Sequence, residues 1–248
     1  MTLLNSKDGT NFYIPEKKSF RPKRVDPAHV KQAFTFAYGM TFGREGAHRT
    51  HRSGGSYRRR NGEIFCDAFQ GKLAEYFVYQ SFTEMGIICP EPDTEKWNRG
   101  KWDDADFIIN EKSINVKSMA FFSNLLLLET KDWDEIGTYI PNNKAYDYFL
   151  VARIQPEAKA LFRKRRMLYS DDISSDQITQ LLNEQTFSAD IPGFVTNTFL
   201  RKIIQEKQIL PKGAMLNGHT KMDAENFYVI SCDFVEVVEI MSPLTKEL

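Results

Sequence analysis

A stretch that is apolar on two helical faces most constrains how this chain can fold. Residues 63–86 read EIFCDAFQGKLAEYFVYQSFTEMG, and large apolar side chains recur along them at helical spacing. The face around Leu73 is apolar, and so is the opposite one, where Val78 and Phe82 follow Glu75 at i+3 and i+7. Such a helix is buried between other elements. We expect Glu75 to lie in a cleft or to pair with another group, because a lone buried carboxylate is costly.

Segments with strand patterns follow this helix and alternate with further helical segments. Residues 105–110 (ADFIIN) and 113–118 (SINVKS) are short strand patterns, and residues 146–154 (YDYFLVARI) suit the interior of a sheet. Helices are expected over 173–187 and 193–207, and NFYVISCDFVEVVEIM reads as one long strand or a strand pair. This order predicts an α/β (α+β) fold with a mixed central β-sheet flanked by helices.

The length and composition predict a single domain with an N-terminal arm. The chain has 248 residues and neither an internal repeat nor a long Gly/Ser linker. Residues 1–26 are polar, and we expect them to form a flexible arm. A helix is predicted to begin at Pro27, because Asp26 can cap it and proline is favoured at the first helical position. The domain is therefore expected over residues 27–248.

The cellular compartment is predicted from what the sequence lacks. No apolar run approaches the roughly 20 residues of a membrane-spanning helix, and the first residues, MTLLNSKDGTNFYIPEKK, have no signal-peptide core. The three cysteines, Cys66, Cys89 and Cys232, have no metal-ligand spacing, and their odd number argues against a disulfide framework. These features predict a cytoplasmic protein with reduced thiols and no membrane partner.

Basic residues are concentrated in one part of a chain whose net charge is zero. Between Lys17 and Arg60 there are 12 Lys and Arg residues against two acidic ones, so this segment carries +10 and the remainder −10. A basic segment on an otherwise acidic protein predicts a polyanionic partner. The alternative is a solvated, charged arm without a particular role.

The most basic part of this segment, residues 44–60, is glycine-rich and is expected to form a DNA-binding loop. Arginines suit phosphates and guanine edges, glycines let a backbone approach a ligand, and a tyrosine can stack or donate a hydrogen bond. The two histidines have no nearby Cys or His that would complete a zinc set. The expected DNA contacts are His48, Arg49, His51, Arg52, Tyr57, Arg58, Arg59 and Arg60.

The two short strands are expected to pair as an antiparallel hairpin around NEKS. If Ile109 lies opposite Ile114, then Asp106 lies opposite Lys117. Asn115 shares their face, because side chains alternate along a strand, and the apolar residues take the core-facing side. A loop of two or four residues keeps this grouping, whereas a loop of three shifts the register by one and breaks it.

An Asp, an amide and a Lys on one face match what metal-assisted phosphodiester hydrolysis needs. Asp106 can bind Mg²⁺, a hard cation that prefers oxygen ligands, and Asn115 can offer its carbonyl oxygen to the same ion. Such an ion lowers the pKa of a bound water and neutralises charge that builds up on the phosphate. Lys117 can hold or deprotonate the attacking water and stabilise the transition state.

Around these residues the chain resembles the PD-(D/E)XK nuclease superfamily, which includes most type II restriction endonucleases. The pattern of that superfamily is an Asp at the start of one strand, acid–any–Lys in the next, and usually a Glu on a preceding helix. Here the places are taken by AD ending at Asp106, by NVK from Asn115 to Lys117, and by Glu75 within QGKLAEYF. The resemblance covers residues 63–155 and includes the order helix, strand, strand, strand.

The resemblance implies a Mg²⁺-dependent DNA endonuclease of restriction type that cuts double-stranded DNA. Asp106, Asn115 and Glu75 would hold the metal, and Lys117 would act on water and phosphate. It also implies a homodimer, because cutting both strands of a palindrome calls for two sites related by a twofold axis.

Asn115 stands where this pattern has Asp or Glu, so the site has one negative charge fewer. Three explanations are open: a natural variant in which Glu75 or Asp104 supplies the missing charge, an inactivating change, or a degenerate nuclease fold that binds DNA without cutting it. Asp104 shares the face of Asp106, but we favour Asp106 as the ligand because apolar strand residues follow it directly. A junction-resolving or repair nuclease with the same core is a further alternative.

Overall fold

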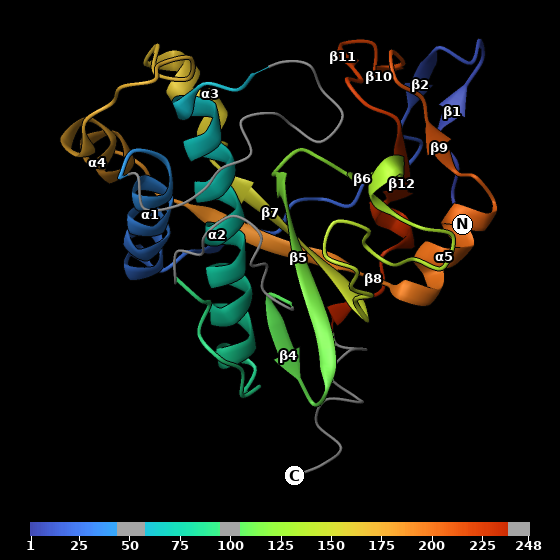
Figure 1. Cartoon of the computed structure of the whole chain (residues 1–248), viewed down its shortest axis with the longest axis horizontal. Coiled ribbons are helices and arrows are strands. Elements are labelled where there is room, and N and C mark those ends of the chain that lie inside the picture. The colour runs from blue at the N-terminus through green and yellow to red at the C-terminus, as the bar shows by residue number, and fades with distance from the viewer. Residues whose placement is uncertain (44–57, 95–104, 238–248) are drawn as a thin grey trace.

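The computed structural model describes residues 1–43, 58–94 and 105–237, and helices and mixed sheets together form its fold (Figure 1). The expected general class, an α/β fold with a mixed sheet, is therefore confirmed. Within the described ranges no helix is both long and apolar enough to span a bilayer. The α-helices in these ranges are α1 (Pro27–Thr41), α2 (Asn61–Glu84), α3 (Ala158–Lys164), α4 (Ser175–Asn183) and α5 (Asn197–Gln205).

A five-stranded mixed sheet forms the centre of the molecule. Its strands lie in the order β3-β8-β7-β5-β4, with β5 and β7 parallel and the other neighbours antiparallel. Strand β4 is at one edge, so among the described residues one side of the hairpin that it forms with β5 borders no further strand of this sheet. The bounds are β3 (Lys23–Arg24), β4 (Phe107–Ile109), β5 (Lys112–Ala120), β7 (Tyr148–Gln155) and β8 (Ser188–Thr196).

Two smaller sheets and two 3-10 turns complete the fold. One sheet has the order β6-β12-β9 and the other β1-β2-β10-β11. The turn η1 directly follows β6, and η2 directly follows β12. The bounds are β1 (Asn5–Ser6), β2 (Asn11–Tyr13), β6 (Leu125–Glu129), β9 (Ile209–Leu210), β10 (Met215–Leu216), β11 (Thr220–Lys221), β12 (Asn226–Ile230), η1 (Thr130–Asp132) and η2 (Ser231–Asp233).

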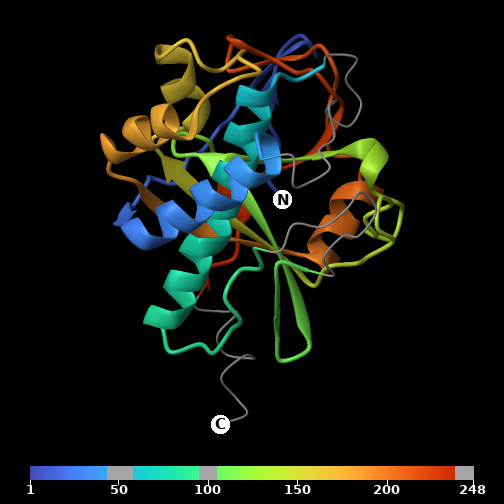
Figure 2. The ribbon, with the colours of Figure 1, turned by 60° about the vertical axis from the view of Figure 1, so that its left-hand side comes forward.

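Helix α2 packs against one face of the central sheet, and α1 packs against α2 (Figure 2). The start of α1 is the one predicted: Pro27 is its first residue and the Asp26 carboxylate accepts a 2.8 Å hydrogen bond from the Ala28 amide. At the start of α2, the Glu63 carboxylate accepts a 3.0 Å hydrogen bond from the Arg60 amide, which satisfies that backbone donor at the helix N-terminus. A local sequence signal therefore sets the start of α1, and the Glu63 carboxylate supports the start of α2.

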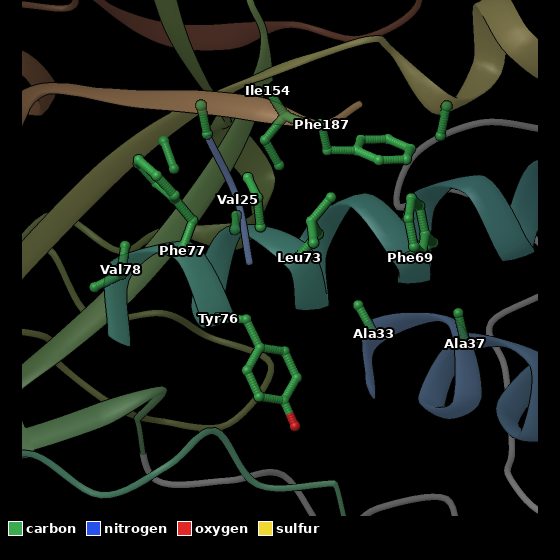
Figure 3. Packing of buried hydrophobic residues seen from close by; sticks show 14 of the residues in the cluster. Val25, Ala33, Ala37, Phe69, Leu73, Tyr76, Phe77, Val78, Ile154 and Phe187 are labelled. Carbon is green, nitrogen blue, oxygen red and sulfur yellow. The ribbon is translucent and has the colours of Figure 1, made fainter. Parts of the chain in front are cut away.

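Helix α2 is buried on several sides, as its double apolar pattern predicted. Figure 3 shows Leu73 and Phe77 directed toward the strands, while Ala33 and Ala37 of α1 approach α2 from another side. Leu73 is completely buried, and so are both alanines. The small alanine side chains let the two helix axes approach closely. Burial of a full apolar side chain stabilises the fold by about 1.5–3 kcal/mol, so α2 is the main anchor of this face.

Strand β7 is buried on both faces, which confirms the interior strand expected from YDYFLVARI. Leu150 and Ala152 pack on the side of α2, while Phe149 and Val151 pack on the opposite side. The opposite side is covered by β6, β12 and α5, which contributes Leu200 and other apolar residues to the same core. The central sheet is thus the middle layer of the fold.

The hairpin of β4 and β5 differs from the predicted one by two residues in register. Ile109 pairs with Lys112 and not, as predicted, with Ile114. The reason is a tight two-residue turn at Asn110 and Glu111, whose φ angles of 47° and 60° are those of a type I′ turn. A shift of two residues preserves which side chains share a face, so the predicted grouping is kept.

Strand β8 corrects one secondary-structure prediction. A helix was expected from residue 193, but the chain remains extended through Thr196 and α5 begins at Asn197. Gly193 is needed within this strand, because its φ is 142° and an added Cβ would lie 2.4 Å from the Val235 carbonyl oxygen. The helix begins where the Thr196 hydroxyl accepts a hydrogen bond from the Phe199 amide.

The N-terminal arm, residues 1–26, lies against the rest of the chain. Its strands pair with β10 and β8, and the Arg153 guanidinium donates hydrogen bonds to the carbonyls of Lys18 and Ser19 at 2.9 and 2.8 Å. Arg153 is buried and forms a two-bond ion pair with Asp190 at 2.6 and 2.8 Å. The flexibility of the arm stays a prediction; these contacts show where it docks.

Candidate functional site

Asp106, Asn115 and Lys117 lie on one face of the hairpin. Phe107 and Ile114 are paired across the strands and are buried against α2, so alternation directs their neighbours to the opposite face. Continuing the same pairing by one residue puts Asp106 opposite Asn115, and Lys117 follows two positions later on β5. This face looks toward the core made by β6, β12 and α5, away from α2.

Asp106 is held in place by the strand that carries the other two residues. Its amide donates a 3.1 Å hydrogen bond to the Ile114 carbonyl, and its Oδ2 atom accepts a 2.6 Å hydrogen bond from the Val116 amide. Val116 stands between Asn115 and Lys117 in the sequence. A single short hydrogen bond therefore ties the carboxylate to the centre of the asparagine–lysine pair.

Asn115 carries the most informative atom of the site. Its Oδ1 atom is buried, and no described residue donates a hydrogen bond to it. Leaving a buried acceptor without a donor costs about 1–3 kcal/mol. Such a group in a native structure calls for an explanation, and a bound ion is one of the ordinary ones.

Lys117 projects beside Val151 of β7 from the same face as Asn115. Burial lowers the pKa of its ammonium group, and the nearby negative charges of Asp106 and Asp132 oppose that change without cancelling it. In the described part of the chain the ammonium forms no direct ion pair. Its charge is therefore available to a ligand that enters the site.

Asp132 lies near enough to this site for its charge to act on Lys117, although nothing in the hairpin pattern indicates it. It ends the turn η1, and Trp133 after it is buried with its ring 5.2 Å from that of Phe149. Phe149 is the β7 neighbour of Asn115. This packing against β7 brings Asp132 near the hairpin, and the letters ETKDW carry no local signal for it.

Glu75 is not grouped with the three hairpin residues. Its carboxylate forms a 2.5 Å ion pair with Lys72, whose ammonium also donates to the Asp93 carbonyl at 2.7 Å and lies over the Phe36 ring of α1. Helix α2 lies on the sheet face opposite to that of Lys117. Of the two expectations for Glu75, a cleft or a partner, the structure shows a partner.

The predicted DNA-binding loop is described only at its end. His48, Arg49, His51, Arg52 and Tyr57 lie outside the described residues, and so does Asp104. Of the remaining three, Arg58 is exposed, Arg59 forms a 2.9 Å ion pair with Asp67, and Arg60 forms a 2.5 Å ion pair with Asp171. Two of these arginines thus secure the start of α2.

The hairpin face fits a small, hard cation in its donor chemistry. Carboxylate and amide oxygens are the ligands that Mg²⁺ prefers, and the Asn115 Oδ1 atom is an acceptor that lacks a donor among the described residues. No set of three or more acidic, His or Cys side chains within the described ranges could hold a metal ion. A cation here would therefore depend on the asparagine oxygen in addition to carboxylates.

Comparisons of the chain with protein-family models, with curated proteins and with solved structures give no match.

Proposed function

We propose that this protein is a Mg²⁺-dependent endonuclease that cuts double-stranded DNA at specific sites, with a restriction-endonuclease-like core of the PD-(D/E)XK type. One observation carries the proposal: Asp106, Asn115 and Lys117 share one face of the hairpin, where a carboxylate, a buried amide oxygen and an ammonium group meet. The two oxygen groups are complementary to a cation and the ammonium is complementary to a phosphate.

Each side chain has a distinct role in this proposal. Asp106 and Asn115 would hold Mg²⁺, which when bound neutralises phosphate charge and makes a water more acidic. The lowered pKa of Lys117 increases the fraction of its neutral amine, so it can accept a proton from the attacking water. The fraction that stays charged can stabilise the developing negative charge on the phosphate oxygens.

The order of elements supports the same proposal. Helix α2, the antiparallel strands β4 and β5, and the buried strand β7 occur along the chain in the order that the resemblance implied, with β6 of another sheet and η1 between β5 and β7. Arg58, the first described residue of the basic loop, is exposed, so its positive charge is accessible to a polyanionic partner. A homodimer would present two such sites to the two strands of a palindrome.

A second candidate function is DNA binding without cleavage. The observation in its favour is Asn115, which leaves the hairpin pattern with one carboxylate where the superfamily has two. A junction-resolving or repair nuclease with the same core would use the same residues but would not require a specific DNA sequence. Metal-dependent cleavage at discrete positions separates these three proposals.

The decisive experiment incubates plasmid and phage DNA with the protein, with Mg²⁺ or with EDTA. Lys117→Ala removes the proposed ammonium group, and Lys112→Ala is the matched control, because Lys112 is an exposed lysine on the same strand. We expect discrete fragments from the unchanged protein and from Lys112→Ala, and none with EDTA or from Lys117→Ala.

Other outcomes point to the other proposals. Cleavage without discrete fragments favours a repair or junction nuclease. Tight DNA binding without cleavage by the protein, and also by its Asn115→Asp form, favours the binding protein and contradicts the nuclease mechanism.

A further inference from the structure

The residue after Asp132 anchors it beside the hairpin site. Trp133 is buried against Phe149, with 5.2 Å between the ring centroids, and Phe149 is the neighbour of Asn115 across the parallel pair β5–β7. The backbone of the turn is also fixed, because the Asp132 carbonyl accepts a 2.9 Å hydrogen bond from the Ile140 amide. The position of Asp132 at the site is therefore set by packing and not by a loose loop.

The Asp132 carboxylate has an unusual combination of neighbours. It lies close enough to Lys117 for its charge to act on the ammonium group, yet the two form no direct ion pair. Within the described ranges it accepts no hydrogen bond. A carboxylate near a lysine but not in contact with it can act on the same ligand as the lysine without being neutralised by a direct ion pair.

The acidic residues near Asp132 in the sequence, Glu129, Asp134 and Glu135, differ in their surroundings, and Glu135 is exposed. Glu129 forms a 3.6 Å ion pair with Lys131. Asp134 accepts hydrogen bonds from two backbone amides of its own loop, at 2.7 and 3.0 Å. Among these carboxylates, Asp132 is the one whose charge acts on the Lys117 ammonium group of the hairpin.

We infer that Asp132 supplies the second carboxylate of the cation site, the one that Asn115 does not provide. Asp106, Asp132 and the buried Asn115 oxygen would then present a divalent cation with two negative charges and one neutral oxygen. The inference rests on the proposed function for the identity of the cation, but it concerns a residue outside the hairpin. If Asp132 supplies the missing negative charge, Asn115 is compatible with a working site. Asp132 then takes the part for which Glu75 and Asp104 were considered.

The test measures cation binding directly. Mn²⁺ suits the same oxygen ligands as Mg²⁺, and its electron paramagnetic resonance signal falls when it binds protein. We would titrate the full chain, Asp132→Asn, and Glu135→Gln, which removes an exposed carboxylate three residues away and serves as the matched control. Asp132→Asn should weaken Mn²⁺ binding roughly ten- to hundredfold, and Glu135→Gln should leave it unchanged.

A rescue variant separates loss of a ligand from loss of the fold. In Asn115→Asp/Asp132→Asn the second carboxylate returns on the hairpin, so Mn²⁺ binding should recover. A variant that had merely misfolded would not recover in this way. Equal Mn²⁺ affinities of Asp132→Asn and Glu135→Gln, or no Mn²⁺ binding by the unchanged chain, would overturn the inference.

The cleavage assay distinguishes this inference from the proposed function. If the unchanged protein and Asp132→Asn cut DNA equally well, the nuclease proposal stands and the role of Asp132 is wrong. If Asp132→Asn weakens Mn²⁺ binding but neither the unchanged protein nor Asn115→Asp cuts DNA, the cation site stands and the nuclease proposal fails.

Discussion

The carboxylate of Asp106 accepts a 2.6 Å hydrogen bond from the backbone amide of Val116. This bond joins the residue before β4 to the residue of β5 that separates Asn115 from Lys117. It lies next to the ladder of the hairpin, at the point where β4 begins. The Asp106 carboxylate thus helps to hold the two strands together and is also the proposed metal ligand. Its contribution to stability and its contribution to chemistry have to be separated by substitution.

Two substitutions of Asp106 separate these contributions. Asp106→Asn keeps an oxygen that can accept from Val116 but removes the charge, whereas Asp106→Ala removes both. We expect both variants to lose cleavage, and only Asp106→Ala to lose stability, by about 1–3 kcal/mol for the amide left without an acceptor. Urea denaturation alongside the plasmid assay checks this. Full cleavage by Asp106→Asn would show that the charge of Asp106 is not used.

Local sequence patterns predicted the helix and strands of this site correctly but not the register in which the two strands pair. The apolar periodicity identified α2, and the alternation of the two strands grouped Asp106, Asn115 and Lys117, because both periods depend only on neighbouring residues. The register was wrong by two residues, since it depends on the left-handed turn at Asn110 and Glu111, and glutamate gives no signal for that conformation.

Features that depend on distant contacts were not predictable from local patterns. Asp132 comes near the site through the packing of Trp133 on Phe149, which joins the end of η1 to the start of β7 across the loop between them. Strand β8 remains extended at Gly193 because the segment around Val235 approaches its backbone, and no local pattern reports that approach. Tertiary packing of this kind overrides local propensity.

The charged ammonium group of Lys117 should lower the free energy of unfolding of the protein at neutral pH. Burial lowers the pKa of its ammonium group, so the unfolded chain binds more protons than the folded one between that lowered pKa and the ordinary value of about 10.4. Stability therefore rises with pH through this window. Lys117→Met should melt at a higher temperature than the unchanged protein at neutral pH, with the difference shrinking as the pH approaches the ordinary value.

Calorimetric melts across this pH range test the expectation, with Lys112→Ala as the control. Lys112 is exposed and its ion pair with Asp147 contributes at most about 1 kcal/mol. A Lys117→Met variant that is less stable at every pH would contradict the expectation that the charge of the half-buried Lys117 destabilises the fold.

Asn115→Asp should strengthen the site. The substitution adds a carboxylate oxygen where a buried amide oxygen has no donor among the described residues, and it lies on the same face as Lys117. We expect half-maximal cleavage at a Mg²⁺ concentration roughly tenfold or more lower. Asn115→Ser, which also replaces the amide but adds no charge, should raise the required concentration. An unchanged Mg²⁺ requirement in both variants would exclude Asn115 as a ligand.

Arg153 should be among the most sensitive positions of the fold. Its guanidinium is 1% exposed, forms two hydrogen bonds with Asp190, and donates to the carbonyls of Lys18 and Ser19. Arg153→Met leaves Asp190 as a buried, unpaired charge, which costs about 3–5 kcal/mol. Limited proteolysis should then cut the N-terminal arm faster, and Arg153→Met/Asp190→Leu should recover stability. An arm equally protected in Arg153→Met would show that Arg153 does not hold it.

Asp147 should make the hairpin sensitive to acid. Burial raises the pKa of its carboxyl, but hydrogen bonds from the Ser113 amide and hydroxyl, both 2.9 Å, and the Lys112 ammonium outweigh that effect, so the pKa lies below its ordinary value. A carboxyl with a depressed folded-state pKa stabilises the protein above its unfolded value of about 3.9, and this stabilisation is lost as the pH falls through the folded value. Asp147→Asn should therefore lower the free energy of unfolding by about 1 kcal/mol near pH 7, a modest loss because the ion pair with Lys112 is partly exposed. In strong acid the substitution should have no effect. Urea denaturation of both proteins at several pH values measures the difference, and a gap that persisted unchanged into strong acid would show that the loss comes from packing rather than from the charge.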